Sequence, residues 1–366
     1  MKNRLLLLSV AIFLFLSLTA CGLKMGSYVS AGEKLINSRE ELHKMVEKSL
    51  TDGKTEISFE TTKLNKDDFE YLNREHDGFY GRVSGYTIRS FKFLDKSYVT
   101  LSCEIYDNYY VEKAILEDKD IPEDRKEARK LLSVCRKLLP EIMKGDPSDY
   151  RKEKRIHDYL VSNTEYGYRD GDKGDDSRAY GSYGALVEKK AVCNGYAQAM
   201  KLLCDLTGVE CEMISGTADG ENHAWNLIKI GEGWYHVDTT WDDPEPDDPE
   251  RIFYHYFNVN DDFIGIDHSW DREDYRAARG IDYNYFVLND LKCKDFHQFR
   301  KKCQEIFEDE TDENPNLLQI QVDDYDKDLY SEENLQFLFH QSGADSLNIQ
   351  TVGKPPCVTL YIMLSY

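Results

Sequence analysis

The chain has 366 residues and a formal net charge of −22, from 46 Lys and Arg against 68 Asp and Glu. This length suggests two or three domains with enough chain to bury a sizeable core. The acidic balance disfavours nucleic-acid binding, because phosphate groups repel such a surface. Anionic lipid headgroups repel it too, so a membrane location would require an anchor.

The first residues are typical of an export signal. Lys2 and Arg4 precede an apolar run from Leu5 to Leu18, which is shorter than the ~20 residues of a membrane span. The run ends in Leu18-Thr19-Ala20-Cys21-Gly22, which resembles a bacterial lipobox. The resemblance implies a signal peptide over residues 1–20, lipidation of Cys21, and a protein anchored at the extracytoplasmic face of the bacterial cell membrane. An uncleaved N-terminal helix is the alternative.

After a lipidated tether at residues 21–37, the pattern predicts an N-terminal α/β region over residues 38–145. Its expected elements are a helix over 39–50 capped by Ser38, a strand over 56–60, a helix from Asn65, strands over 86–94 and 98–106, and an amphipathic helix over 123–143. The breaker cluster Gly145-Asp146-Pro147 marks the boundary. A further helix, capped by Ser148, carries Ile156, Tyr159 and Leu160, and residues 170–178 are expected to form a loop.

A C-terminal α/β region is predicted over residues 293–366. Its elements are a strand over 318–322, a helix over 331–339 and strands over 346–351 and 357–364. This order resembles the N-terminal region, although few residues match, so duplication and convergent patterning both remain open. Each sheet would have one face that must pack against the central part of the chain or against the other sheet.

Cys193 is predicted to lie at the start of a helix. Ala197, Met200, Leu203 and Cys204 follow at helical spacing, and Thr207-Gly208 is a normal helix end. Unpaired N–H groups and the positive end of the helix dipole favour a thiolate there, and the same groups can receive an oxyanion. Gly195 and Ala197 allow neighbouring chain to come close.

A hairpin is expected to bring an imidazole and a carboxylate together. The pattern predicts a strand over 209–215, a loop over 216–222, and strands over 223–230 and 234–240 joined by the turn Gly231-Glu232-Gly233. If the hairpin loop has an even number of residues, Asp238 lies opposite Trp225 and diagonal to His223 on one face. An odd loop without a bulge would separate the two side chains.

The segments around these residues resemble one known family. Val192-Cys193-Asn194-Gly195-Tyr196-Ala197, His223-Ala224-Trp225-Asn226 and His236-Val237-Asp238-Thr239-Thr240-Trp241 look like the core of the bacterial transglutaminase-like superfamily. Residues 257–259 and 267–270 are similar to the aromatic extension that follows that core. The resemblance implies an α+β, papain-like catalytic domain over residues 146–292, with a helix carrying Cys on an antiparallel sheet. It also implies Cys193 as nucleophile, His223 as base and then acid, and Asp238 as the residue that orients the histidine.

The implied chemistry is acyl transfer on peptide amides through a thioester, with a peptide or protein as substrate. Hydrolysis by a peptidase and cross-linking to an amine share this triad, and water exclusion decides between them. The alternative is a catalytically silent surface binding module that retains the fold. The substrate-binding candidates are Tyr180, Tyr183, Trp225 and Trp241, and a second oxyanion donor is sought among Tyr180, Ser182 and Tyr183.

A structural zinc site is not expected, since the chain has neither Cys-x-x-Cys nor His-x-x-x-His. No cofactor and no other metal are expected either, and the acidic charge disfavours a nucleic-acid partner. The acidic stretch 242–250 lacks ordered calcium-loop spacing and predicts a solvated surface loop. His236 is expected to be a partly exposed strand residue, and His268 to serve packing or loop hydrogen bonding. The cysteines other than Cys21 and Cys193 are expected to be mainly buried free thiols.

Overall fold

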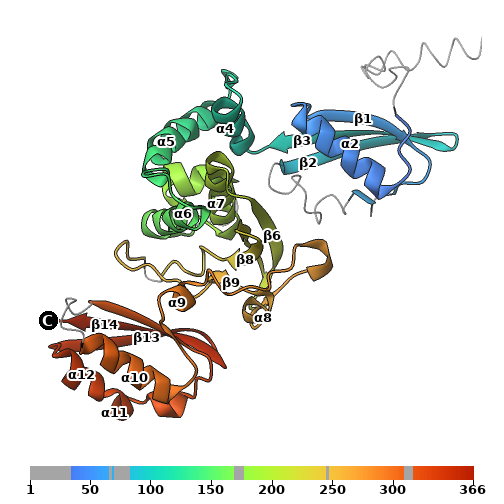
Figure 1. Ribbon diagram of the computed structural model, residues 1–366. Coiled ribbons are helices and arrows are strands. Elements are labelled where there is room, and N and C mark those ends of the chain that lie inside the picture. The colour runs from blue at the N-terminus through green and yellow to red at the C-terminus, as the bar shows by residue number, and fades with distance from the viewer. Residues whose placement is uncertain (1–33, 66–67, 70–82, 169–176, 245–246, 309–315) are drawn as a thin grey trace, which may run out of the picture. The chain divides into compact units, whose positions relative to one another are not determined.

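The computed structural model describes residues 34–65, 68–69, 83–168, 177–244, 247–308 and 316–366 (Figure 1). The predicted signal peptide and Cys21 lie outside the described residues, as do most of the helix expected from Asn65 and most of the loop expected at 170–178. Among the described residues, no helix combines the length and the apolar character that crossing a membrane would require.

The chain forms two compact units, one from residues 1–73 and 85–104 and the other from residues 74–84 and 105–366. In the smaller unit, helix α2 lies across a sheet of order β1-β3-β2 (Figure 1). The N-cap was predicted correctly, because the Ser38 side chain accepts a hydrogen bond from the N–H of Glu41. The elements of this unit are α2 (Arg39–Thr51), β1 (Glu56–Thr61), β2 (Val83–Phe93) and β3 (Lys96–Ile105).

The larger unit begins with four helices that share one hydrophobic cluster. They are α4 (Asp107–Leu116), α5 (Lys126–Ile142), α6 (Asp149–Asn163) and α7 (Cys193–Thr207). The sequence analysis missed α4 and placed α5 in the N-terminal region. Val111 of α4 and Leu131 of α5 are fully buried with residues of α7, so both helices belong to the core that supports Cys193. The predicted domain division is otherwise not tested and stays a prediction.

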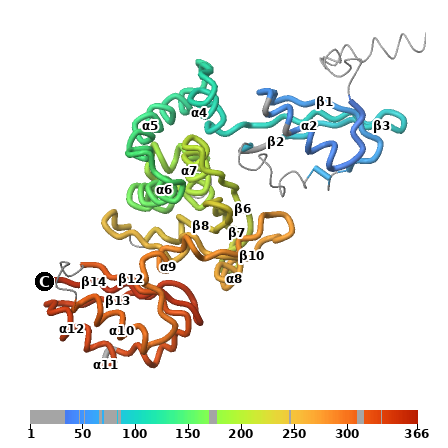
Figure 2. The backbone as a smooth tube through the Cα atoms, in the orientation of Figure 1, coloured from blue at the N-terminus to red at the C-terminus, as the bar shows by residue number. Residues whose placement is uncertain are grey.

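An antiparallel five-stranded sheet of order β10-β6-β7-β8-β9 lies beside α7 (Figure 2). The loop predicted at 216–222 is wrong, because β6 and β7 continue to a two-residue turn, Asp219-Gly220. The helix and sheet meet through Ala197, Met213 and Ala224, which form a small buried cluster. The strands are β6 (Cys211–Ala218), β7 (Glu221–Ile230), β8 (Gly233–Val237), β9 (Phe257–Val259) and β10 (His268–Ser269).

The C-terminal sheet has the order β11-β12-β14-β13. One of its faces meets the catalytic region, since the ring of Tyr361 lies 3.8 Å from that of Phe253 and His255 hydrogen-bonds with Thr359 at 2.6 Å. The predicted helix 331–339 is two short helices. The elements are β11 (Lys292–Cys293), α10 (Phe296–Phe307), β12 (Leu317–Val322), α11 (Glu332–Leu335), α12 (Phe337–Ser342), β13 (Ser346–Lys354) and β14 (Cys357–Ser365).

Short elements complete the described chain. They are β4 (Glu165–Tyr166), a 3-10 turn at Ser177–Tyr180, a π-helical turn at Gly184–Glu188, β5 (Lys190–Ala191), α8 (Asp261–Ile264), α9 (Tyr285–Leu288), and 3-10 turns at Arg272–Asp274 and Lys327–Tyr330. The described chain thus combines helices with sheets that are mainly antiparallel, and the predicted α+β class is confirmed.

Candidate active site

The start of α7 is held in place by the segment just before it. The N–H of Val192 donates to the carbonyl of Ala179 at 3.0 Å, and the Asn194 amide donates to the carbonyl of Tyr180 at 2.6 Å. The two segments approach so closely that a Cβ on Gly195 would lie 2.3 Å from the carbonyl oxygen of Ala179. Glycine is therefore required at this position, and Cys193 lies partly exposed at the helix N-terminus.

The predicted three-residue turn Gly231-Glu232-Gly233 is wrong by one residue, because Gly233 already belongs to β8, and the even loop that remains is the alternative that joins His223 to Asp238. Ile230 pairs with Gly233 across the two-residue turn, and Asn226 pairs with Val237. Extending this register by one residue places Trp225 opposite Asp238. His223 Nε2 then lies 2.7 Å from Asp238 Oδ2, in a contact that is buried on both sides.

The Cys193 side chain is close enough to His223 to act on the same ring, so the imidazole lies between the influence of the thiol and that of the carboxylate. Burial opposes protonation of this ring, but the charge and hydrogen bond of Asp238 and the effect of Cys193 outweigh it and raise the pKa of His223 to about 10. An imidazolium beside the sulfur stabilises a thiolate. The arrangement can therefore hold a nucleophile and a proton donor at the same time.

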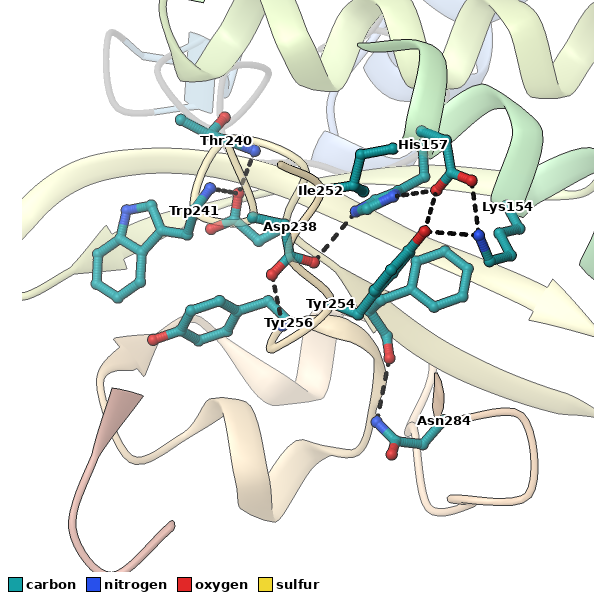
Figure 3. A network of polar contacts seen from close by, with 12 residues as sticks. Lys154, His157, Asp238, Thr240, Trp241, Ile252, Tyr254, Tyr256 and Asn284 are labelled. Carbon is teal, nitrogen blue, oxygen red and sulfur yellow. Dashed lines mark hydrogen bonds and ion pairs between the residues drawn. The ribbon is translucent and has the colours of Figure 1, made fainter. Parts of the chain in front are cut away.

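Asp238 is fully buried and is met by four hydrogen-bond partners. The backbone N–H groups of Thr240 and Trp241 donate to its Oδ1 at 3.0 and 3.2 Å, as Figure 3 shows. Its Oδ2 faces His223 and, at 3.1 Å, His268 Nε2. Although burial works against the charge, the two imidazoles hold the pKa of Asp238 well below its usual range. The carboxylate is fixed in one orientation.

His236 differs from its predicted surroundings, whereas His268 makes the kind of contact that was predicted. His236 was expected to be partly exposed, but it is fully buried, accepts from Trp225 Nε1 at 3.0 Å and lies 2.9 Å from Asp261 Oδ1. The buried ring of His236 therefore connects Trp225 of β7 to Asp261. His268 does hydrogen-bond with a loop, but the loop is that of Asp238. Thirty residues separate the two in sequence, and the pattern Asp267-His268-Ser269-Trp270 carried no signal of this contact.

A second polar network lies next to the site, on the loop that follows Asp238 (Figure 3). His157 of α6 lies 3.2 Å from Asp242 Oδ2 and 3.2 Å from Asp158 Oδ1, and the N–H of Tyr256 donates to Asp242 Oδ1 at 2.9 Å. Asp243 accepts from the hydroxyl of Tyr196. The expectation of a solvated loop over 242–250 is therefore wrong at its start, because Asp242 is fully buried.

The substrate-binding candidates occupy different environments. Tyr180 is 39% exposed, and its hydroxyl lies 2.8 Å from that of Tyr168. Trp241 is partly exposed, with its ring 5.7 Å from that of His223. Tyr183 is buried in the main hydrophobic cluster and Trp225 is buried beneath His223, so substrate can reach Tyr180 and Trp241 more readily. Of the oxyanion candidates, Ser182 is also buried.

Ligand atoms of His223, Asp238 and His268 lie within 4.8 Å of one another, close enough to hold a metal ion. Both imidazole Nε2 atoms already face the same carboxylate oxygen. Protons on these nitrogens satisfy all three groups, and a metal would have to displace them. The absence of a metal stays a prediction. The seven other described cysteines are buried and free, as expected.

Comparisons with known proteins agree with this core. Residues 136–239 match the family model of the Transglutaminase-like superfamily, and this span contains Cys193, His223 and Asp238. The chain thus carries a transglutaminase-like domain, and the predicted transglutaminase-like, papain-like α+β fold is confirmed.

Two curated relatives share this part of the chain. Kyphoscoliosis peptidase of Mus musculus is 25% identical over 121 residues, which are 30% of this chain and 18% of that protein. The Homo sapiens protein of the same name is 25% identical over 116 residues, 28% of this chain and 17% of that protein. The chain therefore spans less than a fifth of the relatives that it matches.

Solved structures show weaker overall likeness. A structure described as a TGase is 13% identical with a TM-score of 0.29, covering 58% of this chain and 59% of that one. The periplasmic domain of TgpA from Pseudomonas aeruginosa is 16% identical with a TM-score of 0.24, covering 40% and 54%.

Proposed function

We propose that this transglutaminase-like chain is a cysteine-dependent acyl-transfer enzyme that acts on peptide or protein amides through a thioester. The observation that supports this most is the grouping of the three side chains: Cys193 begins α7 and acts on the ring of His223, which lies 2.7 Å from Asp238. Each member supplies one requirement of the chemistry: a sulfur nucleophile, a proton carrier and a fixed acceptor.

The steps follow from these positions. The Cys193 sulfur attacks the amide carbonyl carbon, and the oxyanion that forms is stabilised by the N–H groups at the helix start. His223 then gives its proton to the leaving nitrogen, the C–N bond breaks and a thioester remains. A water or an amine, deprotonated by His223, attacks the thioester and releases the thiolate. Water yields a carboxylic acid, and an amine yields a new amide.

Selective alkylation tests the nucleophile. Iodoacetamide should label the wild-type protein mainly at Cys193, and Cys193→Ala should lose that label together with all amide turnover. Cys357→Ala is the matched control, because this buried thiol of β14 pairs with Asp323 and with no imidazole. Equal labelling of wild type and Cys193→Ala would contradict the proposal and favour a silent binding module.

Product analysis separates the two acyl acceptors. The protein is incubated with a glutamine-containing peptide and a labelled primary amine, and the products are read by mass spectrometry. Amine incorporation indicates cross-linking, and cleavage or deamidation alone indicates hydrolysis. Trp241→Ala, at the partly exposed ring near His223, should weaken turnover of the peptide more than it changes alkylation by the small iodoacetamide probe.

The location of the enzyme is part of the proposal and rests on the lipobox resemblance at Cys21. Expressed in a bacterium, the wild type should sediment with membranes, and its intact mass should correspond to loss of residues 1–20 plus an acyl-modified cysteine. Cys21→Ala should lose the added mass and leave the membrane fraction. A wild type of unmodified full-length mass would exclude the lipid anchor.

A further inference from the structure

His268 occupies a position in the site that the triad does not account for. It is buried in β10, and its Nε2 lies 3.1 Å from Asp238 Oδ2, the same oxygen that faces His223 at 2.7 Å. Its Nδ1 lies 2.6 Å from Asp267 Oδ1. The rings of Trp241 and Trp225 enclose it, with centroids 4.6 and 5.0 Å away.

The protonation state of His268 follows from its two partners. Ionised carboxylates only accept hydrogen bonds, so a ring with both nitrogens on carboxylate oxygens satisfies both contacts only as an imidazolium. The hydroxyl of Tyr256 donates to the other oxygen of Asp267 at 2.8 Å, which keeps that carboxylate in place. The same two carboxylates raise the pKa of His268 against the effect of burial.

We infer that His268 is a positioning residue that holds a buried positive charge next to Asp238. This charge fixes the orientation of the Asp238 carboxylate. It also weakens the attraction of that carboxylate for the proton of His223. The inference rests on the proposed function, because it concerns the proton that His223 must release to the leaving amine. The centroids of the two imidazole rings are 5.5 Å apart. At that separation inside a protein, one charge changes the protonation of the other strongly.

Several charged and titratable groups of the described chain act on this pair, among them the hydroxyl of Tyr256, which donates to Asp267, and the buried carboxylate of Asp242, whose charge opposes that of Asp238. Asp238 and Asp267 face His268 directly, and His223 faces Asp238 from the other side. His236 acts on the same cluster, and its pKa is lowered, chiefly by burial. His255 is close enough to Asp267 to feel its charge, but burial lowers its pKa to about 3, so it stays neutral.

The pH profile of Cys193 alkylation tests the inference. In His268→Gln, the positive charge is lost while Asp267 stays negative, so His223 should hold its proton more tightly. The alkaline limb of the profile, which reports loss of the His223 proton, should move to a pH about one unit higher. The kcat/KM for amide turnover should fall about tenfold. An unshifted alkaline limb in a folded His268→Gln protein would overturn the inference.

A double variant separates charge from structure. His268→Gln with Asp267→Asn removes one positive and one negative charge, so the local net charge returns to its original value. The alkaline limb should then return most of the way to the wild-type position. If His268 were only a packing residue, the second substitution would add damage and would not restore the profile.

A measurement on the wild type keeps the test decisive if the variants fold poorly. Nitrogen NMR of histidine-labelled protein should show both His268 nitrogens protonated at neutral pH. A neutral His268 tautomer would overturn the inference while Cys193 alkylation remained selective. Loss of selective alkylation in the wild type would instead contradict the proposed function, so the two failures are distinguishable.

Discussion

Two imidazole–carboxylate pairs meet on one loop of the transglutaminase-like domain. Asp238 pairs with His223, and Asp242, one turn later, pairs with His157. The two carboxylates are linked through the backbone, because the N–H of Asp242 donates to the carbonyl of Asp238 at 3.1 Å. Both acids are fully buried.

The pairs differ in what the second ring nitrogen can reach. His157 has carboxylates on both nitrogens, Asp242 and Asp158, and its ring is fully buried. His223 contacts Asp238, and the Cys193 thiol acts on the same ring. An imidazolium between two carboxylates, such as His157, has no reacting group beside it that could receive its proton. An imidazolium beside a cysteine sulfur at a partly exposed helix N-terminus, such as His223, can donate its proton to a leaving group. The His157–Asp242 pair is therefore expected to stabilise the fold, and the His223–Asp238 pair to take part in the proposed reaction.

The sharpest way to break this comparison is the same substitution in each carboxylate. In Asp238→Asn, the carboxylate oxygen that faces His223 is replaced by an amide N–H₂ group, or the amide turns its oxygen away from the ring. The imidazole then adopts the wrong tautomer, and activity should fall by about 10⁴-fold. Asp242→Asn should lose less than about tenfold, because it does not touch the reacting groups. Steady-state amide hydrolysis and the Cys193 alkylation rate measure both. Comparable losses in the two variants would refute the division into a chemical and a structural pair.

The His157–Asp242 pair should contribute to the free energy of unfolding. His157→Gln leaves Asp158 and Asp242 without their shared cation, and removing one partner of a buried charge pair costs about 3–5 kcal/mol in unfolding free energy. Urea unfolding at neutral pH measures it, with His223→Gln as the comparison. That variant should lose less stability and far more activity, because Asp238 keeps the N–H groups of Thr240 and Trp241 and the ring of His268 as partners. A greater loss of stability in His223→Gln would reverse the assignment.

The pH dependence of that stability has a definite sign. Burial opposes the charge, but Asp158 and Asp242 raise the pKa of His157 to about 9. Its stabilising contribution is therefore complete below the unfolded value of about 6.5 and is lost as the pH rises through about 9. Burial raises the pKa of Asp242 to about 6, which still leaves it ionised at neutral pH. The difference in unfolding free energy between wild type and His157→Gln should accordingly shrink on the alkaline side.

A smaller effect is expected at the glycine beside the nucleophile. In Gly195→Ala the added Cβ meets the carbonyl of Ala179, and overpacking of this kind costs about 1–3 kcal/mol. The shift of the helix start should also slow Cys193 alkylation several-fold. Gly208→Ala is the control, since its Cβ meets no atom within 4 Å but its φ of +77° strains alanine. It should lower stability by about 1 kcal/mol and leave alkylation unchanged.

The sequence by itself determined the parts that depend on local pattern. The helix over 193–207 was predicted from apolar spacing and a glycine stop, and the hairpin that carries His223 and Asp238 was predicted from strand alternation around a glycine turn, although its register was left open until the structure showed a two-residue turn. Such features are set by neighbours within a few residues, which a single sequence displays. The cap at Ser38 and the strands of the C-terminal sheet belong to the same class.

Only the tertiary structure decided which side chains complete the site. His268 reaches Asp238 because β10 pairs with β6, and His157 reaches Asp242 because α6 packs against the loop, over 30 and 85 residues of chain. Buried charges acquire partners through packing of distant elements, and neither charge count nor periodicity encodes that pairing. The same reason explains why Asp242 looked like part of a solvated acidic loop and proved to be fully buried.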